Sequence, residues 1–153
     1  MKCFRVKRKM PAELSERFER ILGPEENIAD ELEMGFCCLS LNNHPGLSSA
    51  YINDRNPLMV YAQQLFVLGR RGDALIGIST SGNSRNVYNA LKTAKVMGIS
   101  TILLTGQKCG ICEKYADFKI KVPACETYRI QEYHLPVYHT LCSMIEEGFY
   151  GEE

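Results

Sequence analysis

The segment 79–84 reads Ser-Thr-Ser-Gly-Asn-Ser and places four hydroxyl side chains and a glycine close together. An apolar run over 74–78 precedes it, and a helical pattern over 86–91 follows it, so the segment lies where a strand passes into a helix. The N–H groups at a helix N-terminus lack partners within the helix, and the helix dipole favours an anion there. Hydroxyl groups add donors, and Gly82 lets the backbone approach a ligand closely. This pattern favours a loop that binds one phosphate group of a small molecule.

The same residue types also serve purely structural roles, because serine and glycine are common in turns and helix caps. Nucleotide-binding patterns do not explain the segment. No lysine stands inside it, as GxxxxGK[ST] would require, and the chain contains no GxGxxG. A phosphate loop and an ordinary capped turn therefore both remain open on the loop residues alone.

Size and composition predict one globular domain over residues 1–153. The hydrophobic content is 45%, the charged content is 24% and the formal net charge is zero. This balance argues against nucleic-acid binding and against a polybasic membrane anchor. Neither a membrane-spanning run nor a secretory signal is recognisable, so we expect no membrane partner and a cytoplasmic location.

The seven cysteines fit a reducing compartment better than a disulfide framework, because their number is odd. Cys109 and Cys112 form a CxxC pair, which is a pattern of zinc and redox sites. No second CxxC accompanies it, so we favour a coincidental loop and keep a metal or redox role as the alternative.

Strand and helix patterns alternate along the chain, which predicts an α/β fold with a parallel sheet covered by helices on both faces, a three-layer sandwich. In such sheets, ligands bind beyond the carboxyl ends of the strands, which is where the segment 79–84 lies. We expect strands over 36–41, 74–78, 100–105 and 118–122, and helices over 13–22, 47–52, 59–68, 83–97 and 127–149. Residues 25–34 predict a short helix or a loop, and 112–116 at most a short helix.

The segment 72–84 as a whole resembles the phosphosugar loop of the SIS (sugar isomerase) domain. The run Arg-Ile-Gln-Glu over 129–132, followed by His134 and His139, resembles the branch of that family that contains phosphoheptose isomerases. The likeness extends over about residues 10–149. It implies a flavodoxin-like fold and an aldose–ketose isomerase acting on sedoheptulose 7-phosphate. It also implies an oligomer, often a tetramer, that in many members contains zinc.

The resemblance also implies roles for individual residues. The carboxylate of Glu13 would be catalytic, with His139 as its acid/base partner. An enediol mechanism moves a proton between neighbouring carbons, and a carboxylate with an imidazole suits that task near neutral pH. Substrate contacts would come from Ser79, Thr80, Ser81 and Ser84 to the phosphate, from Asp54 to the sugar hydroxyls, and from Gln131 to the sugar or to zinc.

Two departures from the family pattern affect these expectations. The family's N-terminal helix and its Gly-Asn-Gly-Gly-Ser loop have no counterpart here, which predicts an N-terminally truncated domain with four strands rather than five. Lys9 stands where the family has a zinc-binding histidine, and an ammonium group offers no lone pair to a metal. Zinc held by Gln131, His139 and Glu13 alone would be weak, so we expect substoichiometric metal.

Two functional hypotheses follow. The first is a phosphosugar isomerase of the phosphoheptose type. The second is a non-catalytic module of the same family that binds a phosphosugar or a protein. In either case a sheet lacking a strand would expose strand edges and apolar surface, so we expect a homo-oligomer, either a dimer or a tetramer.

Overall fold

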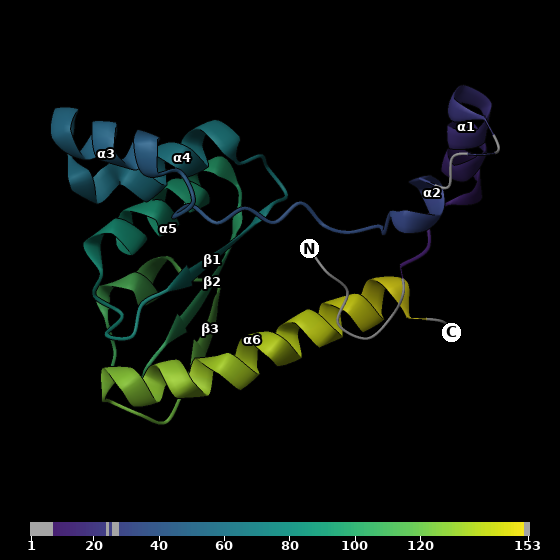
Figure 1. Ribbon diagram of the computed structural model, residues 1–153. Helices are drawn as coiled ribbons and strands as arrows, with labels where there is room; N and C mark the ends of the chain where they lie inside the picture. The colour runs from purple at the N-terminus through teal and green to yellow at the C-terminus, as the bar shows by residue number, and fades with distance from the viewer. Residues whose placement is uncertain (1–7, 24, 26–27, 152–153) are drawn as a thin grey trace. The chain divides into compact units, whose positions relative to one another are not determined.

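The computed structural model describes residues 8–23, 25 and 28–151 (Figure 1). It divides into two compact units. One unit combines Met1–Leu39 with Val137–Glu153, and the other is Ser40–Pro136. The single domain expected over 1–153 stays a prediction. No helix of the described residues is long and apolar enough to span a membrane.

The sheet lies in the unit Ser40–Pro136 and consists of parallel strands in the order β1-β2-β3 (Figure 1). Its first two strands pair with Ala74 opposite Ser100, and its last two pair with Ile102 opposite Phe118. The strands are β1 (Ala74–Ile78), β2 (Ser100–Thr105) and β3 (Phe118–Lys121). These bounds confirm the predictions over 74–78 and 100–105, and β3 ends one residue before the predicted 122.

Helices separate the strands, as the alternating pattern predicts. Helix α5 ends before Gly98, because this glycine adopts the left-handed conformation (φ 71°) that commonly terminates helices. It begins after Ser84, whose extended backbone (φ −64°, ψ 112°) places the first helical residue later than the predicted start at 83. The helices are α3 (Pro45–Asp54), η1 (Pro57–Met59), α4 (Val60–Leu68), α5 (Arg85–Met97), η2 (Ile111–Tyr115) and α6 (Thr127–Tyr150).

The core of this unit lies between α5 and the sheet. Leu91 of α5, Leu103 of β2 and Cys112 of η2 are each 0% exposed and form one cluster. Gly77 of β1 allows this close packing, because a Cβ there would lie 3.0 Å from Cγ1 of Val87. The sheet is thereby fixed against α5, which begins directly after the segment 79–84.

The prediction of a strand over 36–41 is wrong. In the structure this segment has no strand conformation, and Leu39 is 56% exposed. An apolar run becomes a strand only when a neighbouring strand accepts its backbone hydrogen bonds, and no described strand pairs with this segment. The sheet of the described residues therefore has three strands rather than four. On β1, Ile76 and Ile78 are 49% and 55% exposed, so these two side chains are only partly covered.

The other unit contains α1 (Ala12–Leu22), α2 (Ile28–Glu31) and the C-terminal part of α6. Both helices agree with the predictions over 13–22 and 25–34. The guanidinium group of Arg8 links the parts of this unit, because it lies 3.8 Å from the Glu33 carboxylate and 3.7 Å from that of Glu146. The Phe36 ring packs edge-on against that of Phe149, with 4.9 Å between centroids.

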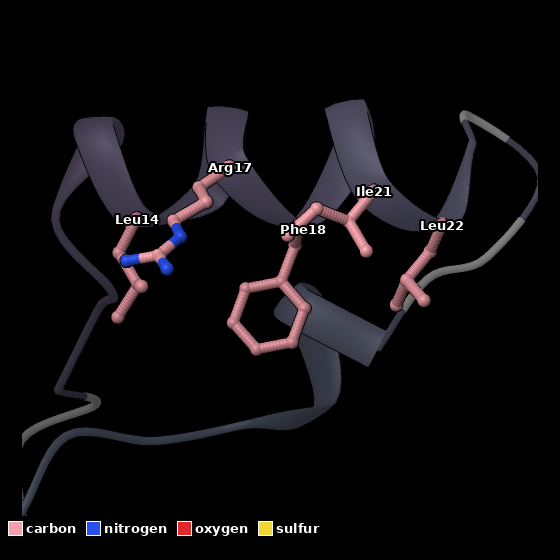
Figure 2. A pocket seen from close by; sticks show the side chains of 5 residues that line it. All are labelled: Leu14, Arg17, Phe18, Ile21 and Leu22. Carbon is pink, nitrogen blue, oxygen red and sulfur yellow. The ribbon is translucent and has the colours of Figure 1, made fainter.

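One side of α1 carries an apolar hollow of about 290 Å³. Figure 2 shows that the side chains lining it project from the same side of the helix. Ile21 is 67% exposed and Leu22 is 42% exposed, so this side of α1 is open to a partner. The lining residues are Leu14, Arg17, Phe18, Ile21 and Leu22, which we call the α1 apolar face.

Candidate functional site

The segment 79–84 begins directly after the last residue of β1, at the carboxyl end of the sheet. Backbone hydrogen bonds to the end of β2 hold its first residues. The N–H of Ser79 donates to the Leu104 carbonyl over 3.0 Å, and the N–H of Gly106 donates to the Thr80 carbonyl over 3.1 Å. The loop therefore leaves the sheet at the strand end where ligands bind in such folds, as the sequence predicts.

Hydrogen bonds within the loop close it into a compact turn. The N–H of Gly82 donates to the Ser79 carbonyl over 3.0 Å, and Gly82 adopts φ 66°, a conformation that favours glycine. The buried Ser79 hydroxyl, 3% exposed, accepts from the Ser84 N–H at 3.3 Å. Among the predicted phosphate ligands, Ser79 therefore has a hydroxyl already engaged by the loop itself.

The other end of the loop is the N-terminus of α5. Ser84 is its N-cap residue, and its carbonyl accepts from the Tyr88 N–H over 2.9 Å. The N–H groups of Arg85 and Asn86 have no acceptor within the helix, because they precede this first helical bond. Ser81 is exposed, while Thr80 and Ser84 are half-buried. Hydroxyl groups, backbone donors and the positive end of the helix dipole thus occur together, which is a suitable environment for an anion.

The CxxC pair lies beside this loop. The buried thiol of Cys112 is 3.7 Å from the Ser84 carbonyl, and burial raises its pKa. Cys109 is exposed, and its sulfur lies 3.5 Å from Nζ of Lys121. Both thiols are free, and Cys112 packs in the core, so it is a structural residue rather than a reactive one.

Two predicted sugar ligands belong to the same unit as the loop. Asp54 is the last residue of α3 and is exposed, and Gln131 is exposed in the second turn of α6. His134 of α6 is only 3% exposed, and its Nε2 lies 3.4 Å from the carbonyl of Thr105, the last residue of β2. That histidine therefore fixes the start of α6 at the carboxyl end of the sheet.

The two predicted catalytic residues belong to the other unit. Glu13 is exposed in the first turn of α1. His139 is exposed on α6, with its ring centroid 5.1 Å from that of Tyr138 in an edge-on arrangement. The loop residues are thus joined by hydrogen bonds with one another, whereas Glu13 and His139 are placed on separate helices.

The described residues do not form a recognisable zinc site. The described part of the chain contains no group of three or more His, Cys, Asp or Glu side chains that could hold a metal ion. Lys9, at the position where the family resemblance implies a histidine, is exposed and offers a cation instead of a lone pair. Weak metal binding stays a prediction.

Sequence reasoning missed two residues that shape the loop. The Asn83 side chain accepts from the Ile111 N–H over 3.1 Å. A Cβ on Gly110 would lie 2.4 Å from the carbonyl carbon and oxygen of Gly82. The only signal for this contact was the glycine inside the CxxC pair, because nothing in a linear sequence shows that residues 28 positions apart touch.

Comparison with known proteins finds related sequences and structures. The model of the family described as "SIS domain" matches residues 39–106, which include the loop and the first two strands. A phosphoheptose isomerase from Akkermansia muciniphila is 42% identical over 113 residues, which are 74% of this chain and 60% of that relative. The chain thus spans about three fifths of the length of such relatives.

Solved structures give the same result. A phosphoheptose isomerase from Neisseria gonorrhoeae superimposes with a TM-score of 0.69 at 38% identity, covering 71% of this chain and 61% of that one. One from Francisella tularensis gives 0.72 at 26% identity, covering 87% and 69%. The three-layer α/β architecture with a parallel sheet is therefore that of these enzymes. The chain contains a SIS domain and is a homologue of the phosphoheptose isomerases.

Proposed function

We propose that the chain is a phosphosugar aldose–ketose isomerase that acts on sedoheptulose 7-phosphate or a closely similar ketose phosphate. The observation that carries this proposal is the hydroxyl-rich loop 79–84 at the N-terminus of α5. The relatives named phosphoheptose isomerase, at 42% identity, support the choice of substrate class.

In this proposal the loop binds the phosphate group. Thr80, Ser81 and Ser84 donate hydroxyl hydrogen bonds, and the first N–H groups of α5 supply further donors. Ser79 holds the loop in shape through its bonds to Ser84 rather than acting as a main ligand. Asp54 and Gln131 bind sugar hydroxyls. Binding at the phosphate and along the sugar orients the carbonyl end of the substrate.

Proton transfer is assigned to Glu13 and His139. The Glu13 carboxylate takes a proton from the hydroxymethyl carbon beside the ketone and returns it to the former carbonyl carbon. His139 passes a proton to the ketone oxygen as the enediol forms and removes one from the neighbouring hydroxyl as it collapses. Isomerisation is thereby balanced without a net change in protons, and neither step needs a redox cofactor.

The alternative is a SIS module that binds a phosphosugar without catalysis. It is favoured by Lys9, which replaces a residue that the family resemblance places near the catalytic carboxylate. The two hypotheses share the loop and differ at Glu13, so a single set of variants separates them.

The test is an assay of aldose formation from sedoheptulose 7-phosphate, run beside thermal unfolding with and without the same ligand. Turnover supports the isomerase. Ligand-dependent stabilisation without turnover supports the binding module. Absence of both contradicts each proposal. Ser81→Ala should weaken stabilisation by the ligand, and the matched control Ser49→Ala, an exposed serine of α3, should leave it unchanged.

We also propose a homo-oligomer in the cytoplasm. The α1 apolar face supports the oligomer, because it leaves large apolar side chains open to solvent (Figure 2). Ile21, for example, is 67% exposed. Free thiols at all described cysteines support the reducing compartment. Ile21→Glu should lower the sedimenting mass, whereas Glu19→Gln, an exposed residue of the same helix, should not. A wild-type monomer at high concentration would contradict the oligomer.

A further inference from the structure

The loop 79–84 rests on a segment that the proposed function does not use. The N–H of Cys112 donates to the Gly82 carbonyl over 2.9 Å, and the N–H of Ile111 donates to Oδ1 of Asn83 over 3.1 Å. Both donors come from the start of η2, and both acceptors lie in the loop. The two segments are thus joined along their backbones although they lie far apart in sequence.

Asn83 connects this support to Ser81, one of the proposed phosphate ligands. While its Oδ1 accepts from Ile111, its Nδ2 donates to the Ser81 carbonyl over 3.0 Å. Its own N–H donates to the Ser81 hydroxyl oxygen over 3.2 Å. One amide side chain therefore fixes the conformation of Ser81 relative to η2.

Gly110 makes the contact possible sterically. Its backbone is extended (φ −139°, ψ 167°), which any residue adopts, so conformation does not require glycine there. The limited space requires glycine instead, because an added Cβ would lie 2.4 Å from the Gly82 carbonyl carbon and oxygen, which are backbone atoms that cannot rotate away. In the other direction, a Cβ on Gly82 would lie 3.2 Å from Cα of Gly110.

The supporting segment is itself held firmly. Cys112 is 0% exposed in the core cluster with Leu91 and Leu103. The Glu113 carboxylate accepts from the Gly110 N–H at 3.3 Å and from the Lys121 ammonium group at 2.9 Å. A firmly packed segment thus contacts a loop whose Gly82 adopts φ 66°, a conformation that favours glycine.

We propose that the segment Gly110–Cys112 is the template that holds the loop 79–84 in its anion-binding conformation, with Asn83 and Gly110 as positioning residues. The role in ligand binding rests on the proposed function of the loop. The physical reason is that a loop ordered before the ligand arrives loses less conformational entropy on binding than one that must order itself.

The test uses Asn83→Ala and Gly110→Ala in the full chain. For a wild type that binds sedoheptulose 7-phosphate, we expect calorimetry to give an affinity about tenfold lower in each variant, with KM raised and kcat nearly unchanged. The matched controls are Asn89→Ala, which removes a 3.0 Å bond to the Leu58 carbonyl elsewhere on α5, and Gly148→Ala, which has open space for a Cβ. Neither control should change the affinity.

Hydrogen–deuterium exchange of the peptide covering 79–84, measured without ligand, separates the template from the proposed function. Faster exchange of this peptide in Asn83→Ala, with unchanged exchange in Asn89→Ala, supports the template. This conclusion holds even if the wild type binds no phosphosugar, because absence of binding would refute only the proposed function. Unchanged exchange and unchanged affinity in Asn83→Ala would overturn the template. Because Asn83 is exposed, that variant keeps the test valid should Gly110→Ala fail to fold.

Discussion

The hydroxyl of Ser79 donates a 2.9 Å hydrogen bond to the hydroxyl of Ser84, so the residue that leaves β1 is bonded to the residue that caps α5. This bond joins the two ends of the loop, and it involves a side chain that is only 3% exposed. Two serines that look equivalent in the sequence, Ser79 and Ser81, therefore have different roles.

Ser79→Ala should destabilise the protein, whereas Ser81→Ala should not. The first change removes a buried hydroxyl with two hydrogen bonds and should lower the free energy of unfolding by about 1–2 kcal/mol. Ser81 is exposed, so its loss should change stability by less than about 0.5 kcal/mol. Urea unfolding of both variants measures the contrast, and equal destabilisation would contradict it.

Gly106→Ala should be strongly destabilising. A Cβ there would lie 2.5 Å from Cδ1 of Ile130 and 2.9 Å from the Thr80 carbonyl, at the point where the loop, β2 and α6 meet. Overpacking of this kind costs about 1–3 kcal/mol. Gly148→Ala on α6, with nothing within 4 Å, is the control and should be neutral or slightly stabilising in the same unfolding experiment.

Acid should weaken the fold partly through Asp117. Hydrogen bonds from the Lys95 ammonium group and then from Thr101 lower the pKa of this carboxyl from 3.8 to about 2. Because the pKa is lower in the folded protein, the contribution is complete above about pH 4 and disappears as the pH falls through 2. Asp117→Asn should therefore reduce the loss of stability on acidification in that range.

The matched control for this pH dependence is Asp30→Asn, an exposed carboxylate of α2. Unfolding free energies of wild type and both variants, compared between pH 5 and pH 2, provide the measurement. If Asp117→Asn and wild type lose stability in parallel over this range, the ion pair with Lys95 has no part in the acid response.

Glu13→Gln should abolish most of the proposed turnover without affecting phosphosugar binding. A general base contributes roughly 100-fold to 10,000-fold to a rate, so kcat should fall by at least about 100-fold while ligand-dependent stabilisation persists. Glu16→Gln, an exposed carboxylate of the same helix, serves as the control. Full activity in Glu13→Gln would remove this residue from the mechanism.

Lys9→His should increase the bound zinc. The wild type should purify with well under one zinc per chain, because lysine offers no lone pair at that position. Elemental analysis of both proteins after exposure to zinc and desalting tests the idea. Stoichiometric zinc in the wild type would show that other residues form the site.

The sequence predicted the elements that surround the loop because their signals are local. The apolar runs of β1 and β2 and the glycine at 98 each specify a boundary without help from distant residues. The segment 36–41 has an equally apolar pattern, but strand formation also needs a hydrogen-bonding neighbour, which a pattern does not reveal.

The candidate site, like the fold, was predictable from the sequence only where its signals are local. Clustered hydroxyls before a helix identify the loop. Its support by Gly110 depends on a tertiary contact so close that an added Cβ would lie 2.4 Å from the Gly82 carbonyl, and no periodicity in the sequence encodes that contact. Likewise, four serine and threonine residues look alike in sequence, and only packing shows that the Ser79 hydroxyl is buried and already bonded.

The two cysteines of the CxxC pair face opposite environments, one exposed and the other within the core. An alkylating reagent should therefore label Cys109 at once and reach Cys112 only when η2 separates from α5. Because Cys37, Cys38 and Cys125 are exposed as well, the label has to be read on the peptide that contains Cys112. Its delay relative to the other labels would time the opening of the hydrophobic core, with no added fluorophore.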